Sequence, residues 1–178
     1  GGTGQEEFGG ADVNDVLRLI DIALELPETL KGGIYMAGHS RGGMMTYRCC
    51  ALDDRIVAAS IGAGVADCVD MYNRREDSMK QVFLELVGGT PEQLPEEYRK
   101  RSAVCWADKI KPPVLICQGD DDWRVDISQA RRMGEELQKY GKEYKLEIFG
   151  RADHSLKGTS YFPDVIAWFR AHPIPAEE

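Results

Sequence analysis

Four short apolar runs alternate with amphipathic stretches along the chain. Each run is seven to nine residues long: GGIYMAG (32–38), IVAASIGAG (56–64), PVLICQG (113–119) and YKLEIFG (144–150). Short, nearly continuous apolar runs are typical of strands that are buried on both faces. Between them, apolar residues recur at intervals of three or four, which indicates amphipathic helices. Strands of this type that alternate with helices predict a parallel sheet with helices on both faces.

Local signals mark where the predicted helices begin and end. Asp12 is a candidate N-cap, and the apolar residues that follow it at helical spacing stop at Pro27. A second helix is predicted from about Gly43 to Leu52, directly after a glycine-rich turn. Asp126 and Gln129 predict a capping box at the start of a third helix.

One long segment interrupts the alternation of strands and helices. Gly141 ends the third predicted helix, and a final amphipathic helix is expected from about 161 to 171. Segment 65–108, in contrast, is long, charged and only partly helical in its pattern. We expect it to be an insertion above the carboxyl ends of the strands, where open α/β sheets bind their ligands. Residues 1–178 are accordingly interpreted as a single domain with this insertion.

Composition and charge narrow the classes of function. Of the 178 residues, 43% are hydrophobic and 29% are charged, as in ordinary globular domains. The net charge of −8 argues against non-specific binding of nucleic acids, which needs a basic surface. No apolar run approaches the roughly 20 residues that cross a bilayer, so no membrane partner is expected.

The cysteines do not point to a redox site or a metal site. There are five, an odd number: Cys49, Cys50, Cys68, Cys105 and Cys117. None of their spacings is that of a metal-ligand pair. We interpret them as small buried side chains in a reducing compartment, which predicts a cytoplasmic location.

The motif that carries chemistry is Gly38-His39-Ser40-Arg41-Gly42, between the first predicted strand and the second predicted helix. It matches G-x-S-x-G, a strained strand-to-helix turn that exposes a nucleophilic serine. Glycines on both sides are expected to let the backbone pass without Cβ clashes. The start of the following helix favours negative charge at the site. The alternative is a glycine-rich surface turn, and the position between strand and helix favours the nucleophile.

A histidine downstream of Ser40 is needed as the base. In this type of site the chain order is serine, acid, histidine. His154 follows the last predicted strand, in the loop that carries the base, whereas His172 lies among prolines and is expected at the surface. The ring of His39 is expected to point away from the serine. His154 is therefore the predicted base.

Several aspartates are candidates for the acid. Asp120, Asp121, Asp122 and Asp126 all follow the third predicted strand. Asp126 has an alternative role as the N-cap of the next helix. The local pattern does not separate the other three.

Several stretches resemble the prolyl oligopeptidase family of serine peptidases and esterases. They are GHSRGGMMTY, PVLICQGDDDWRV, DHSL, EEFGGADVNDVLRLID and GGTPEQLPEEYRKRSA. In that family the acid lies in the pattern H-G-x-x-D-x-x-V, and residues 118–125 read QGDDDWRV. The resemblance therefore implies that Asp122 is the acid, with Gln118 at the position where the family usually has histidine.

The resemblance implies an α/β-hydrolase fold and acyl transfer on peptides or small esters. Ser40 would attack the carbonyl, His154 would move the proton and Asp122 would fix the tautomer of the imidazole. The backbone N–H of Arg41 would be one oxyanion donor. No cofactor or metal is expected, because the chain has no P-loop and no metal-ligand cluster. The alternative is a non-catalytic binding module that keeps this fold.

The resemblance also implies that the N-terminal strands of the fold are missing from these residues. Four or five strands normally precede the nucleophile elbow, but here only about 32 residues precede the strand that leads into it, with one predicted helix. The family's second oxyanion donor, a tyrosine hydroxyl, has no counterpart here, so the chain alone is expected to hydrolyse poorly. The run 32–38 should present an open edge, which predicts self-association or pairing with the missing N-terminal segment.

Overall fold

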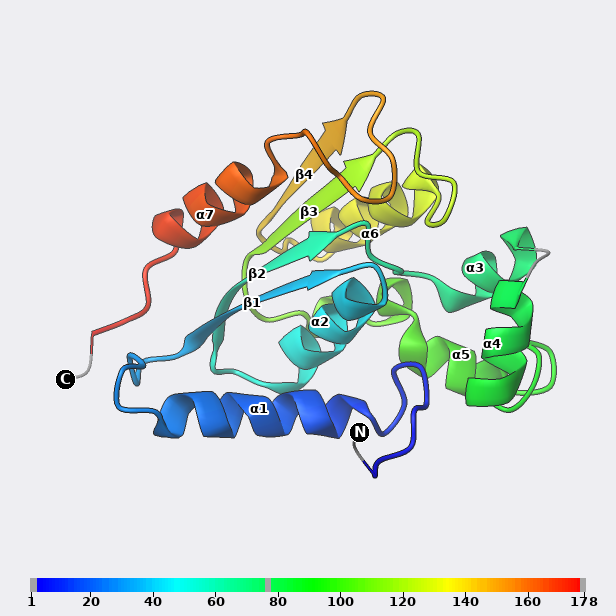
Figure 1. The fold of residues 1–178 in the computed structure, drawn as a ribbon, viewed down its shortest axis with the longest axis horizontal. Coiled ribbons are helices and arrows are strands. Elements are labelled where there is room, and N and C mark those ends of the chain that lie inside the picture. Colours follow the sequence, from blue (N-terminus) through cyan, green and yellow to red (C-terminus); the bar gives the residue numbers. More distant parts are fainter. Residues whose placement is uncertain (1–2, 76–77, 177–178) are drawn as a thin grey trace.

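A four-stranded parallel sheet forms the centre of the molecule (Figure 1). The computed structural model describes residues 3–75 and 78–176. The strands lie in the order β1-β2-β3-β4, and each pairs in parallel with the next. They are β1 (Ile34–His39), β2 (Ile56–Gly62), β3 (Val114–Gly119) and β4 (Tyr144–Phe149). These are the four predicted apolar runs, with ends that differ by no more than two residues, so the parallel sheet is confirmed.

Helices cover both faces of the sheet. They are α1 (Val13–Glu25), α2 (Arg41–Leu52), α3 (Cys68–Arg74), α4 (Ser78–Leu86), α5 (Pro95–Arg101), α6 (Ile127–Lys139) and α7 (Tyr161–Ala171). Two short 3₁₀ turns, η1 (Ala103–Cys105) and η2 (Ala107–Lys109), follow α5. Segment 65–108 therefore holds α3, α4, α5, η1 and all of η2 but its last residue. It lies beyond the carboxyl ends of β1 and β2 in Figure 1.

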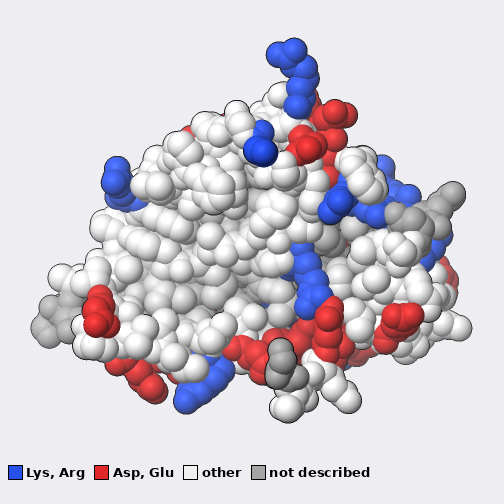
Figure 2. All heavy atoms as spheres, in the orientation of Figure 1, with Lys and Arg blue, Asp and Glu red and all other residues white. Residues whose placement is uncertain are grey.

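The strand that precedes Ser40 lies at one edge of the sheet. Within the described residues, β1 pairs only with β2. Helices α1 and α7, which lie on either side of the sheet in Figure 1, expose large apolar side chains: Leu19 and Ile22 on α1, and Phe162 and Ile166 on α7. Figure 2 shows few charged side chains over the region between these helices, where β1 and β2 lie. This edge thus combines an unpaired strand with an apolar surround.

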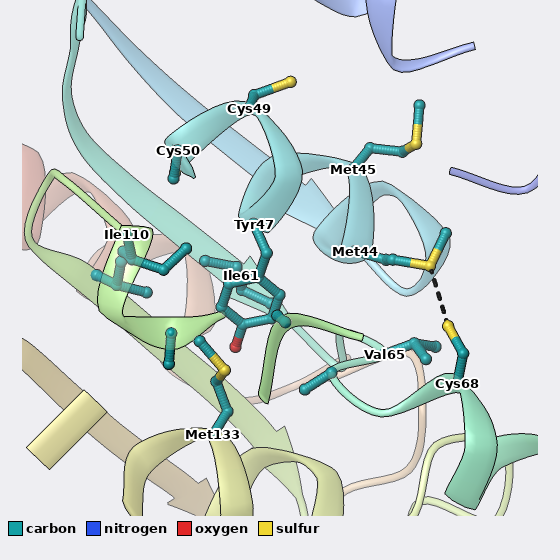
Figure 3. Packing of buried hydrophobic residues seen from close by; sticks show 14 of the residues in the cluster. Met44, Met45, Tyr47, Cys49, Cys50, Ile61, Val65, Cys68, Ile110 and Met133 are labelled. Carbon is teal, nitrogen blue, oxygen red and sulfur yellow. Dashed lines mark hydrogen bonds between the residues drawn. The ribbon is translucent and has the colours of Figure 1, made fainter. Parts of the chain in front are cut away.

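The core has two parts, one on each face of the sheet, because successive residues of a strand point to opposite faces. Val114 and Ile116 of β3 pack with α1, α2 and α6, whereas Leu115 and Cys117 pack with α7. Figure 3 shows the first part, in which Tyr47 of α2 lies near Met133 of α6. One face of the sheet is therefore covered by several helices, and the other face by α7.

The helix starts differ from the predictions in instructive ways. α2 begins at Arg41, two residues before the predicted start. Asp12 occupies the N-cap of α1, but its carboxylate accepts the N–H groups of the preceding loop instead of the helix. Asp126 caps α6 through the Ser128 N–H. Its predicted partner Gln129 is buried and binds segment 66–70, so the reciprocal half of the capping box is wrong.

All five cysteines are free thiols. Four are buried, as predicted, but Cys105 is exposed. Burial raises the pKa of the Cys68 thiol to about 12, and its Sγ lies 3.7 Å from Met44 Sδ (Figure 3). Buried neutral thiols of this kind suit a reducing compartment, and the cytoplasmic location stays a prediction. No helix in the described ranges is long and apolar enough to cross a membrane.

Candidate active site

Ser40 is the single residue between a strand and a helix. It follows His39, the last residue of β1, and precedes Arg41, the first residue of α2. Its backbone adopts φ 58° and ψ −121°, a left-handed conformation that costs a non-glycine residue on the order of 1–3 kcal/mol. The Ser40 N–H donates to the Gly62 carbonyl of β2 at 2.8 Å, which holds the turn to the sheet. The half-buried side chain thereby lies above the carboxyl end of β1.

The glycines of the turn do not have equal roles. A Cβ on Gly38 would lie 2.1 Å from the Gly42 carbonyl oxygen, so strand and helix meet too closely for any side chain there. A Cβ on Gly43 would lie 2.9 Å from Gly64 Cα. A Cβ on Gly42, in contrast, would meet nothing within 4 Å. The expectation that glycines on both sides of the motif prevent clashes therefore holds for Gly38 and is wrong for Gly42.

His154 lies between Ser40 and Asp122, in the loop that follows β4. Its Nε2 is 2.9 Å from Ser40 Oγ, and its Nδ1 is 2.8 Å from Asp122 Oδ2. A neutral ring that accepts the hydroxyl hydrogen at Nε2 carries its own hydrogen at Nδ1, which it donates to the carboxylate. The three side chains thus form one continuous chain of hydrogen bonds.

Asp122 is held by the loop that follows β3. Its Oδ1 accepts the backbone N–H groups of Arg124 and Val125, at 2.9 and 3.0 Å. Its Oδ2 accepts Gln118 Nε2 at 2.9 Å in addition to His154. Burial alone would raise the pKa of this carboxyl, but the hydrogen bonds from His154 and the two N–H groups outweigh it and lower the pKa. The group therefore stays ionised at neutral pH.

The other candidate acids lie away from the imidazole. Asp120 accepts the N–H of Arg151, and the N–H of Asp121 donates to the Ala152 carbonyl. Both are exposed, and Asp126 caps α6. Among the four aspartates left open by the local pattern, Asp122 is the one in contact with His154.

A close backbone approach brings together the loop that carries Asp122 and the loop that carries His154. A Cβ on Gly119 would lie 2.2 Å from the Ala152 carbonyl oxygen, so only glycine fits at the end of β3. Above these loops an open cavity of about 470 Å³ gives access to the serine. Its lining residues are His39, Ser40, Trp123, Arg124, Asp153, His154 and Ser155.

Comparison with known proteins identifies the family. The prolyl oligopeptidase family model matches residues 2–172. The chain belongs to the prolyl oligopeptidase family. The resemblance carried by the motifs around residues 40, 122 and 154 is thereby confirmed.

Two curated relatives are named as a peptidase and as an acylamino-acid-releasing enzyme. The uncharacterized peptidase YtmA of Bacillus subtilis is 32% identical over 165 residues, which are 92% of this chain and 61% of that protein. The acylamino-acid-releasing enzyme of Arabidopsis thaliana is 28% identical and is covered over 23% of its length. The present chain thus spans less than two thirds of both curated relatives.

A solved structure extends the likeness to three dimensions. The uncomplexed acylaminoacyl peptidase of Pyrococcus horikoshii superimposes with a TM-score of 0.85 and 27% identity. The match covers 97% of this chain and 30% of that one. The fold is that of the α/β-hydrolases, as expected.

Two residues beside the site were missed or misplaced by the sequence analysis. His39 was expected to point away from Ser40, but its ring lines the same cavity, and its Nε2 lies 2.7 Å from the His154 carbonyl oxygen. Gln118, which stands where the family usually has histidine, is fully buried and donates a hydrogen bond to Asp122. Both contacts depend on how loops fold over the sheet, so the sequence carries no local signal for them.

His172 lies elsewhere in the molecule. It is half-buried at the end of α7, where Nδ1 contacts the Trp168 carbonyl and Nε2 contacts Glu143, at 2.8 and 2.9 Å. The expected surface position is thus only partly right, since both ring nitrogens are engaged.

Proposed function

We propose that the protein is a serine hydrolase that transfers acyl groups through Ser40, His154 and Asp122. The observation that carries the proposal is the continuous hydrogen-bond chain from Ser40 Oγ through His154 to Asp122 Oδ2. Such a chain activates a serine at neutral pH because the imidazole can take its proton. Membership of the prolyl oligopeptidase family supports the same activity.

The reaction has two halves. In the first, Ser40 Oγ attacks the substrate carbonyl carbon while its proton passes to His154 Nε2, which returns it to the leaving amine or alcohol. An acyl ester of Ser40 remains. In the second, water attacks that ester, its proton passes through the same nitrogen, and the free acid leaves. Asp122 stays ionised throughout and stabilises the imidazolium.

Negative charge develops on the carbonyl oxygen during both attacks. The backbone N–H of Arg41 has no hydrogen-bond acceptor within the described part of the chain, and it lies at the first position of α2 beside Ser40. We assign it as one oxyanion donor, because the N-terminal end of a helix favours an anion. The Arg41 side chain pairs with Glu6 and lies 5.6 Å from the Phe8 ring.

Peptides are the favoured substrates over esters. The curated relatives are named peptidases or acylamino-acid-releasing enzymes. Trp123 lines the cavity above Ser40, and it also borders a neighbouring cavity that Met71 and Arg74 of segment 65–108 line. This assignment treats residues 1–178 as one catalytic domain with an inserted helical segment.

A fluorophosphonate probe tests the proposal directly, because it reacts only with an activated serine. We expect labelling of the full-length protein at Ser40 and none in Ser40→Ala. Ser155 lines the same cavity, so Ser155→Ala is the matched control and should keep the label. Hydrolysis of a peptide anilide and of a p-nitrophenyl ester then ranks the two substrate classes. A full-length protein that folds but takes no label would instead be a non-catalytic binding module.

We further propose that the outer edge of β1 pairs with an additional strand. The strand would come from a second copy or from a segment of the protein outside residues 1–178. The open edge and the apolar side chains of Leu19, Ile22, Phe162 and Ile166 support this proposal. Unpaired strand edges with apolar surroundings recruit other strands readily.

A further inference from the structure

His39 joins the end of β1 to the loop that carries His154. It is the last residue of β1 and precedes Ser40 in the chain. Its Nε2 lies 2.7 Å from the His154 carbonyl oxygen. A carbonyl oxygen can only accept, so His39 Nε2 carries a hydrogen and donates it. The two rings also meet edge to face, with centroids 4.9 Å apart. His39 thus contacts both the main chain and the imidazole of His154.

The backbone on both sides of His154 is strained. Arg151 and Leu156 adopt φ of 57° and 53°, left-handed values that non-glycine residues rarely take. Within the described part of the chain, the peptide groups of His154 make one hydrogen bond, which is the bond from His39. A strained conformation persists only where neighbouring contacts hold it. This bond therefore helps to decide where the imidazole of His154 lies.

His39 is neutral near pH 7. Partial burial lowers the pKa of its imidazole and outweighs the hydrogen bond to the His154 carbonyl, which raises it. The His154 ring lowers the pKa further, and the Asp122 carboxylate opposes this. The ring also borders a second cavity, whose other lining residues carry no charge: Ala37, Gly38, Ser155, Tyr161 and Phe162. A neutral neighbour suits His154, which becomes an imidazolium each time it takes the proton of Ser40.

We propose that His39 is a positioning residue, whose Nε2–H holds the His154 peptide so that the imidazole stays within reach of Ser40 Oγ. Asp122 fixes the ring at Nδ1, and His39 fixes the backbone from which the ring projects. This role rests on the proposed function, since it serves the reaction of Ser40. A misplacement of about 1 Å in a reacting group can cost about 10²-fold in rate. Loss of the bond should therefore slow the reaction more than it weakens substrate binding.

Three substitutions at His39 separate its hydrogen bond from its ring, in the full-length protein. His39→Gln places an amide N–H near the position of the imidazole Nε2, whereas the amide of His39→Asn is one carbon shorter. His39→Phe keeps a ring against His154 but has no donor. We expect kcat for p-nitrophenyl acetate and the rate of fluorophosphonate labelling to fall about ten- to hundredfold in His39→Asn and His39→Phe. KM should change far less, and His39→Gln should recover most of the rate because it restores the donor.

Ser155→Ala is the matched control. Ser155 lines the same two cavities as His39, and its replacement should keep the full rate. Thermal unfolding shows whether each variant is folded, and the comparison of His39→Gln with His39→Asn decides the matter if His39→Phe is not. Equal rates in the two amide variants would overturn the role of the hydrogen bond. A rise in KM without a fall in kcat would overturn it too, because His39 would then be a substrate contact.

The His154 Nδ1 proton gives a readout that does not depend on turnover. A proton held between an imidazole and a carboxylate resonates far downfield in the NMR spectrum, and it stays visible only while its exchange with water is slow. The signal should persist in His39→Gln and broaden in His39→Asn and His39→Phe, because a loosened His154 exposes its bond to Asp122. The same signal in all variants would overturn the positioning role. If Ser40 takes no label while the signal follows the donor, the hydrolase proposal fails and the positioning of His154 by His39 stands.

Discussion

The strands that carry the acid and the nucleophile have very different surroundings. β3 lies between β2 and β4, and all six of its residues are buried. None of the six residues of β1 is fully buried, and within the described residues it has a single neighbour. Asp122 follows β3, and Ser40 follows β1. Asp122 is thus held by contacts within the described residues, whereas the strand that leads to Ser40 has one edge without a partner strand among them.

Substitution of Asp122 should have the largest effect on activity. Asp122→Asn should lower the rate constant for turnover by about 10⁴, because an amide no longer holds the required imidazole tautomer. Stability should change far less than activity. Steady-state hydrolysis and urea unfolding of the same preparations measure the two effects.

Asp126→Ala serves as the comparison for that variant. It removes the cap of α6 and should cost about 1 kcal/mol of unfolding free energy while activity remains. If Asp126→Ala abolished activity and Asp122→Asn did not, the roles assigned to these aspartates would have to be exchanged.

On the nucleophile side, Gly38→Ala should destabilise the fold. Its Cβ would lie 2.1 Å from the Gly42 carbonyl oxygen, and overpacking of this kind costs about 1–3 kcal/mol. Gly42→Ala meets no atom within 4 Å and should instead stabilise α2 by about 0.5–1 kcal/mol. Chemical denaturation of the pair measures the contrast. Equal stabilities would mean that strand and helix are not in such close contact at the serine.

Gln118 offers a finer test of the acid side. Gln118→Leu removes one donor from the Asp122 carboxylate, so the pKa of that acid should rise and the pair should hold a proton more tightly. The low-pH limb of the activity profile should move to higher pH, with turnover lower by about tenfold. Gln118→His, which restores the residue usual in the family, should reverse the shift. An unmoved limb in Gln118→Leu would show that the amide only fills space.

The smallest effect concerns the open edge. Ile34 donates its N–H to the Arg55 carbonyl, just before β2, and Ser40 donates to Gly62 at the end of β2. The alternation of the strand therefore directs the Ala37 N–H away from β2. Ala37→Pro removes that donor and should weaken association through β1 about fivefold, the value of one hydrogen bond. Light scattering over a concentration series measures this, with Ala37→Val as the control that keeps the N–H. Association that is identical in both variants would place the contact elsewhere.

The sheet and the order of the three site residues were predictable because they depend on local patterns. Each signal is local in the sequence: an apolar run, a glycine-serine turn, and a histidine soon after the last strand. The structure then singles out Asp122 among four neighbours through one contact with His154.

What the sequence could not indicate depends on contacts between distant segments. Gln129 looked like half of a capping box, but its side chain satisfies the N–H groups of Ala66 and Asp67 instead. A buried amide takes the partners that would otherwise be left without hydrogen bonds, and those partners come from another part of the chain. The exposure of Cys105 and the contact of His39 with His154 likewise depend on how distant segments pack.

The distances along the chain between the three side chains bear on how the site forms during folding. Asp122 and His154 are 32 positions apart, whereas Ser40 and His154 are 114 positions apart. Because the entropy lost on closing a loop grows with its length, the β3–α6–β4 unit can bring acid and base together before the longer loop closes. We therefore expect the nucleophile to be activated last. A partly folded chain would then carry a Ser40 of ordinary reactivity. Acyl transfer would begin only when residues from all three segments have come together.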